Sequence, residues 1–151
     1  MTAKRSTGRA RLTMACALGV ALFVASAAPS PVHADARRRE YLARLDLVLD
    51  GLVRTMHWVE RYRGTSSAVR FAHPLVERYV EMAGRMTPSP DLVALHPHLI
   101  LIAENVERAV AAAENDDMSM YRQRVRTVRL EMRTLETILA QLEVRLPSMS
   151  R

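Results

Sequence analysis

The stretch MSMYRQRVRTVRLEMRTLETILAQLEVRL, residues 118–146, decides the fold class. Its apolar residues recur at alternating steps of three and four, which is the spacing of one face of a helix. The row consists of Met118, Tyr121, Val125, Val128, Met132, Leu135, Leu139, Leu142 and Leu146. The alternation with a period of two that marks a half-buried strand is absent from it. The stretch therefore predicts one long amphipathic helix, which we expect to end at Pro147 and Ser148.

Three earlier segments carry the same spacing. The first row is Leu42, Leu45, Leu49, Leu52, Met56 and Val59. The second is Val69, Ala72, Val76, Tyr79, Ala83 and Met86. The third is Leu92, Leu95, Leu99, Ile102, Val106, Ala109 and Ala113. Four segments of this kind predict an all-α domain.

Turn-forming residues separate the four segments at 64–67, 87–91 and 115–117. We expect Ser66 or Ser67 to cap the second helix and an Asp to cap the last one. Pro74 and Pro97 lie inside the second and third segments, where each kinks its helix or sets the true start. Short connections favour an up-down-up-down four-helix bundle. The alternative is a three-helix arrangement in which residues 66–96 are irregular.

Residues 1–34 have the order of a secretory signal peptide. A basic start with Lys4, Arg5, Arg9 and Arg11 precedes an apolar run at 12–28 that contains Cys16. The small-residue site Val32-His33-Ala34 follows, and it predicts cleavage after Ala34. The remaining domain, residues 35–151, is expected in the periplasm or outside the cell. The alternative is an uncleaved membrane anchor, for which the apolar run is short.

Removal of the signal changes the charge balance. Four of the 22 basic residues and none of the 16 acidic ones precede residue 35, so the domain has 18 basic and 16 acidic residues and a net charge of +2. This balance does not indicate a nucleic-acid partner. No transmembrane helix is expected after signal cleavage. The domain also has no cysteine, so it must fold by burial alone.

The histidines are weak candidates for metal ligands. His57 and His73 are expected at one end of the bundle, and His96 and His98 at the other. The four cannot converge on one ion, whereas a structural zinc site takes four ligands. The Glu-x-x-His pairs of di-iron bundles are also missing. We therefore predict neither a metal nor another cofactor.

In helix number, helix lengths and the hairpin pattern of residues 99–136, the chain resembles the small exported b-type cytochromes of the four-helix-bundle kind. Those cytochromes use a Met early in the first helix and a His late in the last. Here Leu42 and Leu45 lead the first row, and the segment 118–146 has no His. The resemblance therefore implies the bundle architecture without the haem ligands.

Two groups of residues are candidate binding surfaces. Arg122, Arg126, Arg129 and Arg133 form a basic stripe on the last helix. This stripe either pairs with Glu104, Glu107 and Glu114 of the third helix or contacts an acidic partner or anionic lipid. The second group surrounds Trp58, which points away from the first apolar row and has Arg54, Arg61 and Tyr62 as helical neighbours. It is either local cation–π packing or an interface.

These patterns favour an exported, non-enzymatic bundle that acts through protein or surface contacts. No nucleophile elbow or phosphate-binding loop occurs, so an enzyme is not predicted. The alternative function is a metal- or haem-binding four-helix bundle of the cell envelope. The apolar rows also fit self-association, which leaves a homo-oligomer as a third interpretation.

The signal-peptide interpretation has a direct test. Protein recovered from its native host should begin at Asp35, because signal peptidase would remove residues 1–34. Intact-mass spectrometry checks this, and recovery of the chain with its N-terminal Met1 from the cell envelope would contradict it.

Overall fold

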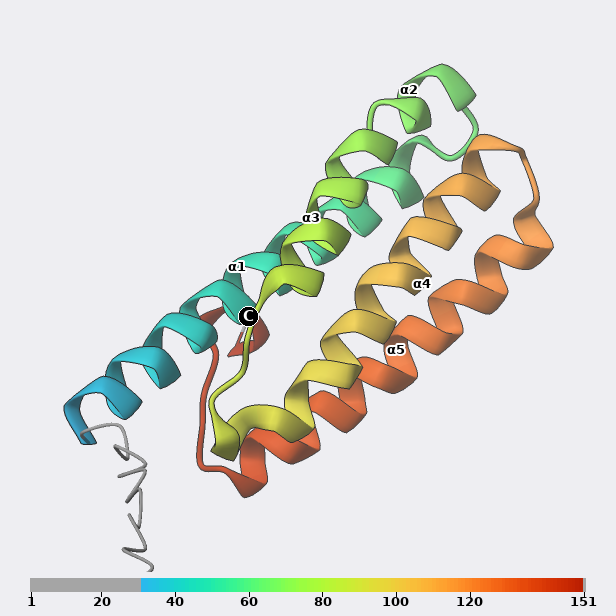
Figure 1. Cartoon of the computed structure of the whole chain (residues 1–151). Coiled ribbons are helices and arrows are strands. Elements are labelled where there is room, and N and C mark those ends of the chain that lie inside the picture. The colour runs from blue at the N-terminus through green and yellow to red at the C-terminus, as the bar shows by residue number, and fades with distance from the viewer. Residues whose placement is uncertain (1–30, 151) are drawn as a thin grey trace, which may run out of the picture.

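The computed structural model describes residues 31–150, which contain five α-helices and two short 3₁₀ helices and no strand (Figure 1). The elements are α1 (Pro31–Tyr62), α2 (Ser66–Arg70), α3 (His73–Arg85), η1 (Pro90–Leu95), α4 (His96–Glu114), α5 (Met118–Gln141) and η2 (Pro147–Ser150). The predicted all-α helical bundle, with four long helices, is confirmed. The up-down-up-down order of the helices stays a prediction. Residues 66–96 are not irregular, because they form α2, α3 and η1.

The predicted signal lies largely outside the described residues. Residues 1–30 are not described, and α1 begins at Pro31, before the predicted cleavage site at Ala34. Cleavage there would remove the first turn of α1 and leave the rest of the helix in the domain.

Helix α4 lies at the centre of the bundle. It packs against α5, α3, α1 and α2, and in Figure 1 α5 lies along one side of it while α1 and α3 lie along the other. Burial on several sides requires small side chains where neighbouring helices approach closely, and Ala103, Ala109 and Ala113 are all fully or almost fully buried. The long apolar side chains of α4, Leu99 and Ile102, fill the spaces between its neighbours.

Pro74 and Pro97 set the starts of their helices and do not kink them, which was one of the two possibilities that the sequence left open. Pro74 occupies the first turn of α3 and Pro97 the first turn of α4, where the missing N–H has no helical partner to lose. The second predicted segment is therefore divided into α2 and α3. The N-cap prediction for this region was wrong: Thr65 holds the cap position of α2, and its side chain makes no capping hydrogen bond.

The last helix is shorter than predicted and ends at Gln141 instead of Pro147. Glu143 adopts a left-handed conformation with φ 55°, and two backbone hydrogen bonds close the helix end. Val144 N–H donates to the Leu139 carbonyl at 2.9 Å and Glu143 N–H to the Ala140 carbonyl at 3.1 Å. This is a Schellman ending, which glycine usually provides. Because a glutamate provides it here, the sequence carried no signal for the stop.

The chain then folds back, so that η2 contacts α1. Leu146 is 4% exposed, which keeps the last residue of the predicted row in the core although it is not in the helix. The Ser148 N–H donates to Asp46 Oδ1 at 2.9 Å and ties this C-terminal segment to α1.

The connection between α4 and α5 follows the prediction. Asp116 takes a left-handed conformation with φ 58° after the end of α4. The side chain of Asp117 then accepts a hydrogen bond from Met120 N–H at 2.9 Å, which is the expected cap of α5. The reversal places α5 directly along α4.

Close approach of α1 and α3 depends on a glycine. A Cβ at Gly51 would overlap the ring of Tyr79 on α3. We expect Gly51→Ala to destabilise the bundle by about 1–3 kcal/mol through overpacking. In a Tyr79→Ala background the same substitution should be neutral or stabilising by up to about 1 kcal/mol, because alanine favours helix over glycine. Denaturant unfolding of the four chains measures this difference, and equal effects in both backgrounds would contradict the contact.

Candidate functional site

An open groove runs between α1 and α5. The two helices have few close backbone approaches, although each packs against α4. The space between them encloses a cavity of about 480 Å³. Its floor and walls are mostly apolar and come from three helices: Leu52, Val53 and Met56 of α1, Val106 of α4, and Val125, Val128 and Met132 of α5. This is the volume and character of a ligand or side-chain binding cleft, and we call it the α1/α5 groove.

Polar side chains line the rim of the α1/α5 groove. They are His57, Glu60, Arg129, Arg133 and Glu136. The Tyr121 hydroxyl donates to Glu60 Oε2 at 2.6 Å and bridges α5 to α1. Burial of this hydroxyl and its hydrogen bond to Glu60 both raise the pKa of Tyr121, so it remains a donor at neutral pH. The bridge closes the groove near the start of α5.

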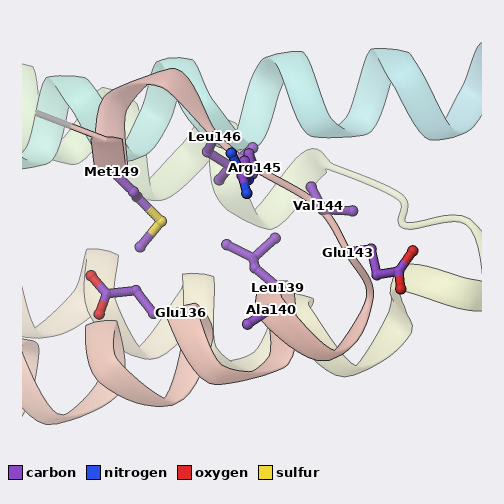
Figure 2. A pocket seen from close by; sticks show the side chains of 8 residues that line it. All are labelled: Glu136, Leu139, Ala140, Glu143, Val144, Arg145, Leu146 and Met149. Carbon is purple, nitrogen blue, oxygen red and sulfur yellow. The ribbon is translucent and has the colours of Figure 1, made fainter.

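The other end of the groove is filled by the chain's own C-terminal segment. Figure 2 shows residues 143–149 crossing between α5 and α1. Leu146 and Met149 of this segment line the same pocket as Leu139 of α5. A second cavity of about 530 Å³ lies beside this segment, and Glu136 lines both cavities. The two cavities therefore adjoin at Glu136: apolar side chains of the tail line one of them, and the α1/α5 groove is open from Glu136 toward Tyr121.

The arginine stripe of α5 lies along the open part. Arg129 and Arg133 line the groove, and Arg122 and Arg126 are exposed on the same helix. Among residues 31–150, none of the four forms an ion pair with a carboxylate. Arg122 bonds only the Met118 carbonyl of its own helix.

The alternative in which these arginines pair with α4 was wrong. Glu104 pairs with Arg108 of its own helix, at 3.0 Å. Glu114 faces Arg70 and His73 on the opposite side of α4, at 3.1 Å from each. Glu107 lies beside His73 and Glu77, so none of the three carboxylates pairs with the stripe.

Trp58 is partly exposed on α1, on the second predicted surface. Its ring stacks at a tilt on Tyr62, with 5.0 Å between centroids, and it is 36% exposed. Arg54 lines a shallow pocket with Trp58, while Arg61 is exposed nearby along the helix. Trp58 therefore packs against an aromatic neighbour on its own helix while part of its ring stays exposed.

Sequence reasoning missed two members of the Trp58 surface. Phe71 is 78% exposed and Leu75 is 47% exposed, and both line the pocket beside Trp58. Each falls outside the second apolar row, and this was the signal that could have identified them. They belong to the α2–α3 region, which only the tertiary fold brings to α1.

The four histidines have separate surroundings. His57 lines the α1/α5 groove, whereas His73 bonds Glu114. His98 Nδ1 lies 2.7 Å from Glu131 Oε2 of α5, and His96 Nδ1 lies 3.3 Å from the Tyr41 hydroxyl of α1. No hydrogen bond or ring contact joins any two of these histidines in residues 31–150.

Comparisons with known proteins give no relative. No protein-family model matches the chain, and no curated protein or solved structure matches it. Within residues 31–150, no helix combines the length and the apolar character needed to cross a membrane.

The Tyr41–His96 contact predicts a pH dependence. Burial raises the pKa of Tyr41 to about 12 and lowers the pKa of His96 from its ordinary 6.5. The hydroxyl therefore donates to a neutral imidazole. Since the unfolded chain takes up this proton more readily, the contribution of His96 to stability is present above pH 6.5 and is lost as the pH falls through the lower pKa of the folded state.

His96→Phe should remove this part of the pH dependence. We expect the free energy of unfolding to fall less between pH 7.5 and pH 5 in the variant than in the unsubstituted chain. Urea unfolding at both pH values, compared within each chain, cancels the direct effect of the substitution. An identical fall in the two chains would contradict a neutral, partly buried His96.

Proposed function

We propose that this chain is an exported, non-enzymatic bundle protein that binds an acidic amphipathic helix of a protein partner in the α1/α5 groove. The single observation that supports this is a row of arginines without ionic partners, in the described residues, beside an open apolar cleft. An apolar cleft with a row of arginines along one helix favours a helix with an apolar face and acidic flanks. Export rests on the signal-like residues 1–34.

The dimensions of the open part agree with such an occupant. From Tyr121 to Glu136 the groove follows about four turns of α5, or roughly 22 Å at 1.5 Å per residue. A partner helix of about 15 residues covers this length. Its apolar side chains would enter between Met56 and Met132, whose flexible thioethers adapt to varied shapes.

The chain's own tail supplies a precedent for this mode of binding. Leu146 and Met149 already line the adjoining cavity, which shares Glu136 with the α1/α5 groove. The partner would extend this packing into the groove that the tail leaves open. Two arginines, Arg129 and Arg133, line the open groove.

The test uses two synthetic amphipathic helices of about 18 residues, with the same leucine face and with either glutamates or lysines at its edges. Fluorescence anisotropy should show binding of the acidic peptide and at least about 10-fold weaker binding of the basic one, since like charges at an interface are unfavourable. Binding of the acidic peptide should weaken with added salt.

Two pairs of substitutions locate the binding surface. Arg129→Glu with Arg133→Glu should remove selectivity for the acidic peptide, whereas Trp58→Ala with Arg61→Glu, on the other predicted surface, should leave it intact. Equal binding of both peptides would overturn the proposal, as would loss of binding only in the Trp58 pair. If the protein binds phosphatidylglycerol vesicles and does not distinguish the two peptides, the stripe is a lipid-binding surface instead.

A further inference from the structure

We propose a binding site for a first-row divalent cation, of the zinc class, formed by His73 and Glu77 of α3 and Glu107 of α4. The site lies away from the α1/α5 groove and does not depend on the function proposed for the groove. One ligand atom from each of the three residues lies within 4.8 Å of the other two. A nitrogen and carboxylate oxygens are donors that zinc accepts.

Local structure brings the three residues together. Pro74 begins α3 at His73, and Glu77 lies one turn later on the same face. Glu107 and Glu114 are seven residues apart on α4, which is two turns, so both face α3. The α3 and α4 backbones pack against each other. The cluster therefore belongs to rigid helices and not to a loop.

The orientation of the imidazole is an independent indication of a ligand. His73 Nδ1 lies 3.1 Å from Glu114 Oε2, and an ionised carboxylate only accepts, so Nδ1 carries the hydrogen. In a neutral ring the lone pair is then on Nε2, which lies 3.5 Å from Glu77 Oε1. A carboxylate that holds one ring nitrogen while the other faces the ion is the usual support of a metal-binding histidine.

The charges of the cluster also favour a cation. Arg70 pairs with Glu114 at 3.1 Å, but within residues 31–150 no arginine pairs with Glu77 or Glu107. Two carboxylates thus face one imidazole without a basic side chain to balance them. A divalent ion would neutralise both.

Small movements complete the coordination. Ligand atoms on one tetrahedral zinc ion lie about 3.4 Å apart, given metal–ligand distances of about 2.1 Å. The 3.5 Å between His73 Nε2 and Glu77 Oε1 already fits, and separations of up to 4.8 Å must shorten by up to about 1.4 Å. The Glu77 side chain is 56% exposed and His73 is 31% exposed, which allows both adjustment and entry of the ion. The fourth position is left to water, so this is a three-ligand site that joins α3 to α4.

The test is titration of tag-free protein with zinc, followed by calorimetry and thermal unfolding. We expect one ion per chain and a rise in Tm of roughly 5 °C or more at a 100-fold excess over Kd, because the ion binds only the folded chain. Co²⁺ in place of zinc should give the visible absorption of a four-coordinate ion. Absence of saturable binding at about 100 µM zinc would overturn the proposal.

Matched variants separate this site from adventitious binding. His73→Gln and Glu107→Gln should each abolish the Tm rise, and Glu107 is the sharper variant because its removal breaks no ion pair. Glu114→Gln should weaken affinity about 10–100-fold without abolishing it. Glu104→Gln, one turn from Glu107 and paired with Arg108, is the control and should bind as the unsubstituted chain does. Zinc binding that survives His73→Gln and Glu107→Gln would contradict the assignment.

Discussion

The packing of α4 against all the other long helices is the constraint on which the rest of the structure depends. Helix α4 contacts α1, α3 and α5, whereas α1 and α5 scarcely approach each other. Nine of its residues are buried, among them the small residues Ala109 and Ala113. A helix shared in this way fixes the position of each neighbour separately. It does not require the first and last helices to meet, and the α1/α5 groove is the result.

The C-terminal segment covers part of the α1/α5 groove. Apolar side chains of α1 and α5 that no helix covers would remain in water, at a cost of about 25 cal/mol for each Å². Leu146 and Met149 cover one end of the groove, and the Ser148–Asp46 hydrogen bond holds them there. The Schellman ending at Glu143 makes this possible, because a helix continuing to Pro147 would carry Leu146 away from α1.

The sequence was sufficient for the fold class because heptad spacing is a local property with a long-range meaning. Each of the four rows contains residues with exposures near zero, such as Leu49, Val76, Leu99 and Leu135. The helix ends were less predictable. Prolines marked two helix starts correctly. At the end of α5, however, Glu143 adopts the left-handed conformation that glycine usually takes, and a glutamate gives no sequence signal for it. The contacts of His73 and of Phe71 were out of reach, since they depend on how α2 and α3 lie against α4 and α1.

The arginines of α5 differ from those elsewhere in the chain in a way that the sequence does contain. In the other helices an arginine commonly follows an acidic residue by four positions and pairs with it, as in Glu40–Arg44, Asp50–Arg54, Glu81–Arg85 and Glu104–Arg108. This is the arrangement that stabilises an isolated helix, by about 0.3–0.5 kcal/mol for each pair.

Helix α5 lacks that arrangement. The residues four positions before Arg126, Arg129 and Arg133 are Arg122, Val125 and Arg129. None of these is acidic, so the arginines lack the acidic residue that precedes an arginine by four positions in the other helices. Helix stability alone would favour glutamates at these positions. A run of uncompensated positive charge costs stability and creates a field along one edge of the groove. An acidic group outside residues 31–150 would offset that cost, which is the physical basis of the partner proposed for the groove.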